Sequence, residues 1–304
     1  MKVVLCRGYG SPEVLKISDI PKPIPKADEI LIRIQSTAVN SGDIRTRTLD
    51  VKGILKIVMR LVLGWSKPRN PILGTVFSGT VEQRGEAVTS FKNGDRVFGC
   101  SPGFKFGCYA EYITVKESTA ISEMPAHANF DQAAAILFGG TTALYFLNKA
   151  NPTPGQSILV YGASGAVGTS AVQVAKNRGL YVIAVSSGKN EELVRSLGAD
   201  NFLDYTSSDF LDTSLQYDIV FDAVGKLSRK QLAALTRRDG KTLTVGSFDV
   251  AKETKQQLEQ LKTWFDSDKF KAVIDRTYSL EEIKEAHSYV EKGHKVGNVV
   301  VKIN

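Results

Sequence analysis

Cysteine is scarce in this chain, which has three, Cys6, Cys100 and Cys108, among 304 residues. Three thiols make a poor disulfide framework, which disfavours a secreted, disulfide-stabilised scaffold. Long apolar runs are also lacking, because no stretch reaches the roughly 18 consecutive apolar residues of a membrane span. The first residues, MKVVLCRGYGSPEVLKI, contain no apolar signal segment and no small-residue cleavage site. We therefore expect a cytoplasmic protein without a transmembrane segment.

Charge of one sign is not concentrated anywhere in the sequence. The chain has 39 Lys and Arg against 32 Asp and Glu, a net charge of +7, but acids are interspersed among the bases throughout. There is no long Lys/Arg run and no zinc-finger spacing. Nucleic-acid binding is therefore not expected as the main role, whereas a positive field suits an anionic small ligand.

The length and pattern of the chain predict two domains. Residues 1–122 consist of short alternating segments separated by turns, which predicts an irregular β barrel. From residue 123 helical and strand patterns alternate, which predicts a parallel sheet covered on both faces. We expect the first domain to be completed by 267–304 and the second to span 123–266. In that second domain we predict a helix over 131–150 interrupted at Gly139-Gly140, and a helix over 228–240 followed by a strand over 241–248.

A glycine-rich stretch follows one apolar strand pattern and opens a helical one. It has the form G-x-G-x-x-G with alanine in the first place. The pattern is typical of dinucleotide binding, because the second glycine lets a pyrophosphate approach the backbone and the third lets helix and strand pack closely. A plain tight turn between strand and helix is the alternative. The residues expected to contact the cofactor here are Ala163, Ser164, Gly165, Ala166, Val167 and Gly168.

The next strand pattern ends in Ser186, Ser187, Gly188 and Lys189. An Asp or Glu at this place would bind the ribose 2′-hydroxyl of NAD(H) and repel a 2′-phosphate. No acid is present in this segment, and Lys189 follows the small hydroxyls. The segment therefore favours NADP(H) as the cofactor, with Ser186 and Lys189 near the 2′-phosphate. The alternative is that Lys189 is a solvated lysine at the start of a helix.

An apolar segment with helical spacing lies at 51–66. Its apolar positions include Ile54, Val58, Leu61 and Val62, and Trp65 follows. The segment predicts a helix, either packed on the barrel or forming an apolar lid that suits hydrophobic substrates. Attachment to a membrane surface is a lesser alternative, because basic residues flank the apolar face.

Matching stretches over nearly the whole length resemble the medium-chain dehydrogenase/reductase superfamily, and within it the zinc-independent quinone oxidoreductase branch, which is zeta-crystallin-like. They include STAVNSGDIRTR, NPILGTVFSGTVEQRG, FKNGDRVFG, ILVYGASGAVGTSAVQVAK, DIVFDAVG and HKVGNVVV. The resemblance implies an α/β protein with a GroES-like catalytic domain and a Rossmann NADP(H)-binding domain. It also implies an active site in the cleft between the two.

Zinc-dependent members of that superfamily carry a Cys and a Gly-His-Glu where this chain has Asn40 and Gly74-Thr75-Val76. None of these side chains is a good zinc ligand. Two cysteines, Cys100 and Cys108, stand where a structural zinc lobe has four. The resemblance therefore implies zinc-independent hydride transfer to a quinone or an α,β-unsaturated carbonyl, with a small hydrophobic electrophile as substrate. The alternative is a non-catalytic NADPH-binding protein, either crystallin-like or an RNA-binding relative.

By the same resemblance, Asn40 and Asp43 lie near the nicotinamide. Arg45 stands where relatives often have a tyrosine, so it binds the acceptor oxygen or a phosphate, or pairs with a surface acid. The three histidines, His127, His287 and His294, are expected to be structural or exposed, which leaves no strong candidate for a general acid. The remaining expected cofactor contacts are Thr141, Thr142, Tyr205, Val224, Gly225, Val245, Gly246, Ser247, Gly297 and Asn298.

The segment that follows the last expected strand is unusually short. In relatives a further edge strand comes next, and in many of them it pairs with its copy in a second subunit. Here only FDVAK separates strand from helix, too few residues for a crossover to another parallel strand. We therefore expect a sheet that ends near 245–248, and a monomer or a dimer that does not use the usual edge strand.

Overall fold

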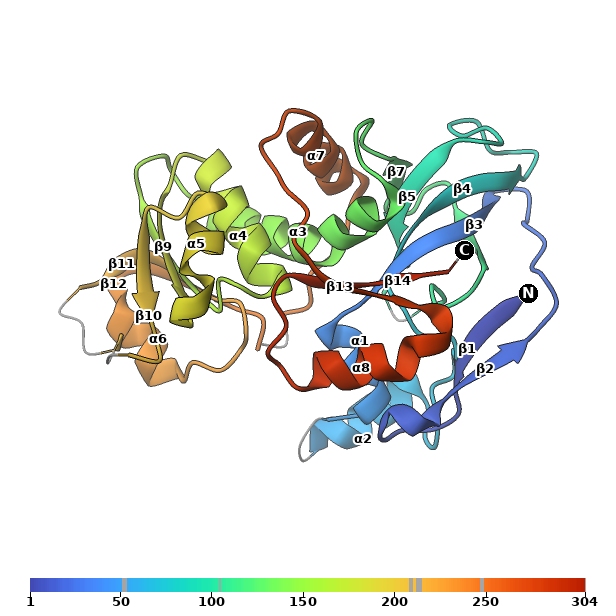
Figure 1. Ribbon diagram of the computed structural model, residues 1–304, viewed down its shortest axis with the longest axis horizontal. Coiled ribbons are helices and arrows are strands. Elements are labelled where there is room, and N and C mark those ends of the chain that lie inside the picture. Colours follow the sequence, from blue (N-terminus) through green and yellow to red (C-terminus); the bar gives the residue numbers. More distant parts are fainter. Residues whose placement is uncertain (51–53, 104, 208–209, 212–214, 247–248, 304) are drawn as a thin grey trace. The chain divides into compact units, whose positions relative to one another are not determined.

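The computed structural model describes residues 1–50, 54–103, 105–207, 210–211, 215–246 and 249–303 (Figure 1). The chain forms two compact units. The first comprises Met1–Phe138, Thr254–Asp266 and Ile274–Asn304, and the second comprises Gly139–Glu253 and Ser267–Val273. The expected limits were 1–122 with 267–304 and 123–266. In this division residues 123–138 and 254–266 fall in the first unit, and residues 267–273 fall in the second.

The first unit is built around one long strand, β3 (Glu29–Val39), which pairs antiparallel with β4, β6 and β14. The main sheet has the order β13-β14-β3-β4-β5-β7, with β6 paired to β3, and β1 and β2 form a separate antiparallel pair. The bounds are β1 Lys2–Cys6, β2 Leu15–Asp19, β4 Val76–Arg84, β5 Arg96–Cys100, β6 Tyr112–Lys116, β7 Ile121–Glu123, β13 Ile274–Ser279 and β14 Asn298–Lys302.

Alternation along β3 builds the core of this unit. Ile30, Ile32 and Ile34 point to one face because successive side chains of a strand alternate between faces. They pack with Phe77 of β4 and Val97 of β5 in one buried apolar cluster. The predicted β barrel corresponds to this sheet around β3, which is antiparallel except for the parallel pair β13 and β14. Figure 1 shows β3, β4 and β5 in blue and teal.

Four α-helices of this unit lie in the described residues: α1 (Ser41–Thr48), α2 (Ile54–Leu63), α7 (Lys255–Asp266) and α8 (Ile283–Glu291). The 3₁₀ turns are η1 (Pro12–Val14) and η3 (Leu280–Glu282). Helix α1 starts directly after β3, at a reciprocal capping box formed by Asn40 and Asp43. The end of β3 and the start of α1 therefore fix both of these predicted site residues.

The apolar helix predicted within 51–66 is present as α2, while 51–53 lie outside the described residues. Met59 and Leu63 contact the core of the unit. Ile57, Val58, Leu61, Val62 and Trp65 are each between 45% and 62% exposed. Among the side chains described from Ile57 onward, the helix therefore packs through Met59 and Leu63 and leaves its other apolar side chains uncovered within this unit.

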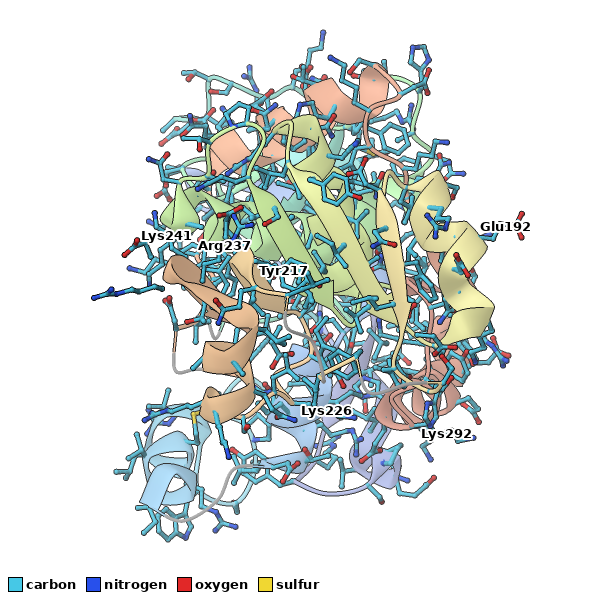
Figure 2. The ribbon with its side chains drawn as sticks, turned by 90° about the vertical axis from the view of Figure 1, so that its left-hand side faces the viewer. Glu192, Tyr217, Lys226, Arg237, Lys241 and Lys292 are labelled. Atoms are coloured by element: carbon cyan, nitrogen blue, oxygen red, sulfur yellow. The ribbon has the colours of Figure 1, made fainter. Side chains whose placement is uncertain are left out.

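The second unit contains a parallel sheet with the strand order β10-β9-β8-β11-β12 (Figure 2). The order reverses between β8 and β11, as in a doubly wound sheet with its topological switch point there. The strands are β8 Ser157–Tyr161, β9 Tyr181–Ser186, β10 Asn201–Asp204, β11 Tyr217–Asp222 and β12 Thr236–Thr244. The helices are the part of α3 (Phe130–Ala150) from Gly139 onward, α4 Ala166–Asn177, α5 Glu191–Ser196 and α6 Arg229–Leu235, with a 3₁₀ turn η2 Gly188–Asn190. The expected Rossmann sheet is confirmed.

The predicted interruption at Gly139-Gly140 is wrong, because α3 is one continuous helix of 21 residues. The glycine serves packing instead. A Cβ on Gly139 would lie 2.1 Å from the carbonyl oxygen of Ala166 and 2.6 Å from Ser170 Oγ. Gly139 therefore lets α4 approach α3 more closely than any residue with a side chain would allow.

The helix predicted over 228–240 is also too long. It begins at the Ser228 capping box and ends at Leu235, and β12 starts at Thr236. The Thr236 hydroxyl donates to the carbonyl of Leu232 (2.7 Å), which satisfies one acceptor at the end of the helix. The register then shifts between Tyr217 and Ile219 of the neighbouring strand. The charged residues after the helix form an irregular start to β12.

The sheet ends at β12. Within the described residues no strand lies between Thr244 and α7, so the five-stranded, shortened sheet expected from the short connecting segment is present. No helix in the described part of the chain combines the length and apolarity needed to cross a membrane.

Candidate functional site

The glycine-rich loop connects β8 to α4 and is held against β9. The amides of Gly162 and Ala163 both donate to the carbonyl of Val185, at 2.9 and 3.0 Å. A Cβ on Gly168 would lie 2.0 Å from the Gly162 carbonyl oxygen and 2.7 Å from Ala163 Cα. Gly168 is therefore required for the close contact between helix and strand that the motif predicted.

The opposite side of the loop is open. Gly165 is the N-cap of α4 and supplies no capping side chain. Among the described residues, no hydrogen-bond acceptor is found for the amides of Ala166, Val167 and Gly168. A Cβ on Gly165 would meet nothing closer than the Gly162 carbonyl oxygen at 3.5 Å. Three amides without acceptors at a helix N-terminus, on a face free of side chains, fit a pyrophosphate.

The ends of β8, β11 and β12 meet through glycine contacts. A Cβ on Gly162 would lie 2.1 Å from Val224 Cγ2, and one on Gly225 would lie 2.7 Å from Gly246 Cα. The predicted contacts Val224, Gly225 and Gly246 are thus brought to the same edge of the sheet as the loop, and Val245 directly precedes Gly246. Ser247 lies outside the described residues.

Asp222 fixes the backbone that follows β11 at this edge of the sheet. This residue was not predicted from the sequence. The side chain is fully buried. Its Oδ1 accepts the amides of Val224 (3.0 Å) and Gly225 (2.7 Å), and its Oδ2 accepts the amide of Leu227 (2.8 Å). The signal was available as an aspartate that ends an apolar strand and is followed three residues later by glycine.

At the end of β9, the structure places an acid that the sequence of this strand does not contain. Ser186 is buried and Lys189 is exposed, and Asp204 of β10 pairs in register with Ser186. A Cβ on Gly188 would lie 2.5 Å from Asp204 Oδ2. Hydrogen bonds from the hydroxyl and amide of Thr206 lower the pKa of Asp204, so it carries a negative charge at neutral pH. Tyr205, the next residue, is 45% exposed.

The two threonines predicted to touch the cofactor are buried in α3. Thr141 is 2% exposed and Thr142 is 8% exposed. Little of either side chain is therefore available to a ligand in this conformation of the unit.

In the first unit, Asn40 is a buried hub of hydrogen bonds. Its Oδ1 accepts the amides of Gly42 (2.8 Å) and Asp43 (3.2 Å), and its Nδ2 donates to Thr75 Oγ1 (2.8 Å). Its own amide donates to Asp43 Oδ2 (3.0 Å). Val299 of β14 pairs with Val39, so the predicted cofactor contact Asn298 neighbours Asn40 across the sheet, and Gly297 precedes it.

Asp43 is fully buried, and burial raises the pKa of its carboxyl to about 7. The Asn40 amide, the Tyr109 hydroxyl and the Gly74 amide act in the opposite direction and lower that pKa. Among the described residues, Asp43 Oδ1 has no hydrogen-bond partner of ordinary geometry. The Tyr109 and Gly74 donors are therefore near the carboxyl but imperfectly aligned, which is consistent with a carboxyl that titrates near neutrality.

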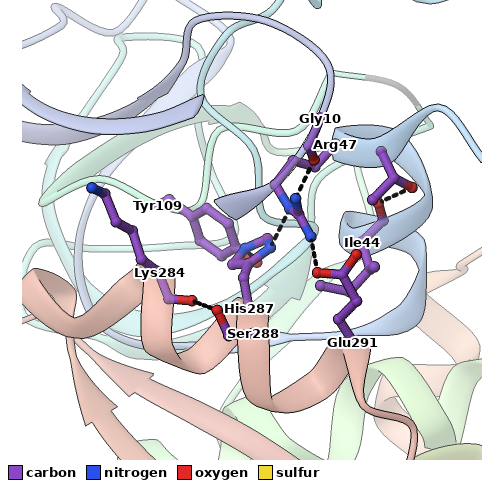
Figure 3. A network of polar contacts seen from close by, with 9 residues as sticks. Gly10, Ile44, Arg47, Tyr109, Lys284, His287, Ser288 and Glu291 are labelled. Carbon is purple, nitrogen blue, oxygen red and sulfur yellow. Dashed lines mark hydrogen bonds and ion pairs between the residues drawn. The ribbon is translucent and has the colours of Figure 1, made fainter. Parts of the chain in front are cut away.

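A chain of buried polar groups leads from Asp43 through Tyr109 to the partly exposed Glu291. Figure 3 shows its part from Tyr109 to Glu291. Tyr109 Oη lies 3.2 Å from His287 Nε2, and Arg47 Nε donates to His287 Nδ1 (3.2 Å). Arg47 is fully buried, donates to the carbonyl of Gly10 and pairs with Glu291 (2.7 Å). Because His287 Nδ1 accepts from arginine, the hydrogen of the neutral ring is on Nε2 and points toward Tyr109. Burial, with Arg47 as the second cause, lowers the pKa of His287 to about 3.

Lys295, which precedes the predicted contact Gly297 by two residues, was not singled out in the sequence. It donates to the carbonyl of Gly297. Burial lowers the pKa of Lys295 to about 8, and Asp275 partly opposes that shift.

Two family models match the sequence: the alcohol dehydrogenase GroES-like domain over residues 26–126 and the zinc-binding dehydrogenase over residues 197–301. The 2-methylene-furan-3-one reductase of Solanum lycopersicum is 33% identical over 317 residues, 99% of this chain and 79% of the relative. The chain belongs to the medium-chain dehydrogenase/reductase superfamily.

Two further matches fall among the reductases of this superfamily. The chloroplastic NADPH-dependent alkenal/one oxidoreductase of Arabidopsis thaliana is 32% identical over 319 residues, 99% of this chain and 79% of the relative. The solved structure of the quinone oxidoreductase from Coxiella burnetii is 28% identical, with a TM-score of 0.85 over 100% of this chain and 99% of that one. The resemblance drawn from the sequence is thereby confirmed.

The zinc-ligand positions of the superfamily are occupied here by side chains of other kinds. Asn40 caps α1 and bonds to Thr75, and Val76 begins β4. Cys100 and Cys108 are buried free thiols. In the described part of the chain, no group of three or more His, Cys, Asp and Glu side chains is placed to hold a metal ion.

Arg45, which replaces the tyrosine of many superfamily members, is exposed on α1. Among the described residues it forms no ion pair, so the surface pairing considered for it is not seen. His127 and His294 are exposed and His287 is buried in the polar chain.

Proposed function

We propose that this protein is a zinc-independent, NADPH-dependent reductase of α,β-unsaturated carbonyl compounds and quinones. The observation that carries this proposal is the glycine-rich loop, whose amides at the start of α4 have no acceptor among the described residues. Two relatives that align with 99% of the chain are named as reductases of an enone and of alkenals and alkenones. The quinone oxidoreductase matched in structure supports quinones as the second acceptor class. Both classes share a conjugated, electron-poor carbonyl.

The open loop supports the cofactor assignment. The amides at the start of α4 would hold the pyrophosphate, and the glycine contacts at the ends of β11 and β12 leave backbone close to it. Bound there, a reduced nicotinamide supplies a hydride to an electron-poor carbon. The chain's own contributions are to bind the dinucleotide, to orient the acceptor and to donate hydrogen bonds to its oxygen.

NADPH is the proposed form of the cofactor, because Lys189 and Tyr205 are exposed beside Ser186 and the Arabidopsis relative is named for NADPH. Asp204 opposes this preference, since its charge lies next to Gly188. Thr206 and the Gly188 amide already engage that carboxylate. We therefore propose a moderate rather than an absolute preference for NADPH over NADH.

The residues proposed to support the acceptor site are Asn40, Asp43 and Arg45 of the first unit. Asn40 and Asp43 are buried and fixed by the capping box. Arg45 is exposed, which would let its guanidinium reach a carbonyl oxygen or a phosphate.

The direct test is the oxidation of NADPH, followed at its nicotinamide absorbance, with a panel of enones, alkenals, and ortho- and para-quinones. We expect steady turnover with at least one conjugated acceptor, undiminished by a zinc chelator. Binding of NADPH without turnover on the whole panel would favour a non-catalytic NADPH-binding protein instead. Loss of activity with the chelator would contradict the zinc-independent assignment.

A matched variant tests the cofactor loop in the same assay. Gly165→Val adds a branched side chain at a backbone conformation that valine adopts, and no described atom lies within 3.5 Å of the new Cβ. The fold should therefore survive, while the side chain covers the three amides. We expect NADPH binding to weaken by about ten-fold or more. Unchanged affinity would show that the pyrophosphate lies elsewhere.

A further inference from the structure

Thr75 occupies the place between Gly74 and β4 in the first unit. Its carbonyl accepts the amide of Ser101 (2.8 Å), which ties the backbone to the end of β5. Its side chain is partly exposed. Gly74 has φ of +90°, and a Cβ there would lie 2.7 Å from Tyr109 Cδ1, so the turn that presents Thr75 is packed directly on the Tyr109 ring.

The orientation of the Asn40 amide is fixed. Its Oδ1 accepts two backbone amides at the start of α1, and a reversed amide would place NH₂ against those two donors. The Nδ2 group therefore faces Thr75 Oγ1, 2.8 Å away. In this contact the Asn40 amide is the donor and the Thr75 oxygen is the acceptor.

This leaves the hydrogen of the Thr75 hydroxyl unused. A hydroxyl has one O–H donor and two lone pairs, and Asn40 occupies one lone pair. No acceptor for the Thr75 hydrogen is found among the described residues. The Thr75 hydroxyl is therefore a partly exposed hydrogen-bond donor, and the buried side-chain amide of Asn40 fixes the position of its oxygen.

The buried polar chain also fixes the backbone of Asn40, the residue that carries this side-chain amide. Asp43 accepts the Asn40 backbone amide, the Tyr109 hydroxyl faces Asp43, and His287 links Tyr109 to Arg47. Asn40, Asp43, Arg47 and His287 are each at most 2% exposed. Such a fully enclosed chain fixes the donor end of the Asn40–Thr75 contact more firmly than a surface side chain would.

We propose that the Thr75 hydroxyl is a catalytic group that donates a hydrogen bond to the carbonyl oxygen of the acceptor while that oxygen gains charge. The inference rests on the proposed function and assigns a residue of this chain to its oxyanion. Asn40 is then a positioning residue that acts through Thr75.

The chemistry balances without a further reactant. Hydride brings two electrons to the β-carbon of an enone, the π electrons of the C=C bond shift to the α-carbon–carbonyl bond, and the carbonyl π pair moves onto oxygen. Thr75 keeps its proton and stabilises the resulting enolate oxygen through the hydrogen bond. A proton from water then reaches the α-carbon, and the saturated ketone forms. A quinone gains hydride and proton with the same charge on oxygen.

The decisive variants are Thr75→Val, which keeps the shape and removes the hydroxyl, and Thr75→Ser, which keeps the hydroxyl. Loss of one oxyanion donor typically lowers kcat by about 10²–10³-fold. We expect a loss of that order for Thr75→Val, substantial recovery for Thr75→Ser and no change in the dissociation constant of NADPH. Thr80→Val on β4 is the matched control, because it makes the same replacement on the strand that follows and should retain wild-type kcat.

A second readout does not depend on turnover. 4-Nitrophenolate is a stable aromatic oxyanion, and its affinity can be measured by competition with the acceptor and by titration of its absorbance. A hydrogen bond to a charged group contributes more to binding than one to a neutral group. We therefore expect Thr75→Val to weaken the binding of 4-nitrophenolate by about ten-fold or more. Thr75→Ser and Thr80→Val should bind it as the wild type does.

The outcomes separate the inference from the proposed function. If the wild-type protein oxidises NADPH with none of the acceptors tested, the proposed function is wrong. If Thr75→Val binds nitrophenolate as tightly as the wild type, the inference is wrong whatever the activity. An active wild type with an equally active Thr75→Val also overturns the inference and leaves the reductase assignment standing. A Thr75→Ser variant as impaired as Thr75→Val would show that a hydroxyl at this position does not restore activity, and it would overturn the inference.

Discussion

At the scale of single residues, a lysine and an aspartate of opposite charge lie near the end of β9. Lys189 is exposed in η2, and Asp204 lies across the register from Ser186 with its carboxylate next to Gly188. A 2′-phosphate at this place would be attracted by the lysine and repelled by the aspartate. Both groups face solvent, so screening limits each effect to a modest one.

The first prediction follows from this pair of charges. Asp204→Asn keeps the acceptor for Thr206 and removes the charge, so NADPH should bind more tightly by several-fold while NADH binding stays nearly constant. Lys189→Ala should weaken NADPH by about three- to ten-fold. Dissociation constants for both cofactors, measured by fluorescence titration of each variant, check this. An unchanged ratio of the two constants in Asp204→Asn would show that the aspartate does not face the 2′-phosphate.

The second prediction concerns the pH dependence of stability. Burial raises the pKa of Asp43 in the folded chain to about 7, whereas an aspartate exposed in the unfolded chain has a pKa of 3.8. The folded protein therefore binds more protons than the unfolded chain between these values, and stability falls as pH rises from about 4 to about 7. Below that window both states are protonated and above it both are ionised, so the contribution is constant there.

Asp43→Asn removes this dependence and keeps an acceptor for the Asn40 amide. The free energy of unfolding of the wild type, measured relative to Asp43→Asn by denaturant titration, should decline across pH 4–7 and stay level beyond it. Asp19→Asn, at an exposed carboxylate, is the control and should track the wild type. A parallel pH profile for wild type and Asp43→Asn would show that Asp43 stays ionised when buried.

The sequence predicted residues whose role depends on their neighbours along the chain. Gly165 and Gly168 could be assigned from the loop motif, and Asn40 could be assigned from the resemblance. Asp204, Asp222 and Thr75 were not predicted as site residues, because each acts through a segment distant in sequence. Asp204 reaches the end of β9 from a neighbouring strand, and the free hydrogen of Thr75 follows only from the orientation of Asn40.

At the scale of elements, the order of strands and helices could be predicted and their ends could not. The alternation of apolar patterns predicted the β8–α4–β9 unit correctly, because each pattern is local. Gly139 misled the prediction for α3, since a glycine that serves close helix packing has the same sequence appearance as one that breaks a helix. The end of α6 depended on Thr236, whose hydroxyl closes the helix through Leu232.

The third prediction tests the packing role of Gly139. Gly→Ala in a helix gains up to about 1 kcal/mol of helix propensity. Here the added Cβ would lie 2.1 Å from the Ala166 carbonyl oxygen, and forcing such backbone apart costs about 1–3 kcal/mol. Gly139→Ala should therefore lower the thermal midpoint, measured by circular dichroism. An unchanged or higher midpoint would mean that α3 and α4 separate freely and that the contact is not required.

At the scale of the whole molecule, the sheet of the second unit ends in a charged strand. Arg237, Arg238, Asp239 and Lys241 of β12 are all exposed, and Arg237 pairs with Asp218 of β11 (Figure 2). Charged side chains on an edge strand disfavour pairing with a second copy. The shortened sheet predicted from the sequence therefore has a protected edge.

The fourth prediction concerns assembly. We expect a monomer, or a dimer through another surface, in analytical ultracentrifugation at micromolar concentration. Replacing Arg238 and Lys241 by valine should promote concentration-dependent association, because it makes the edge apolar and uncharged. A wild-type dimer that dissociates when β12 is altered would show that this edge is an interface after all.

The most direct test of the central claim is the fate of the hydride. The protein would be incubated with an α,β-unsaturated ketone and with NADPH carrying deuterium at C4 of the nicotinamide, using the 4R and 4S forms in turn, and the product would be analysed by mass spectrometry and NMR. We expect a saturated ketone with one deuterium at the β-carbon from one of the two forms, and less of this product from Gly165→Val at the same NADPH concentration. Deuterium at the carbonyl carbon of an alcohol, or no deuterium in any product, would contradict it.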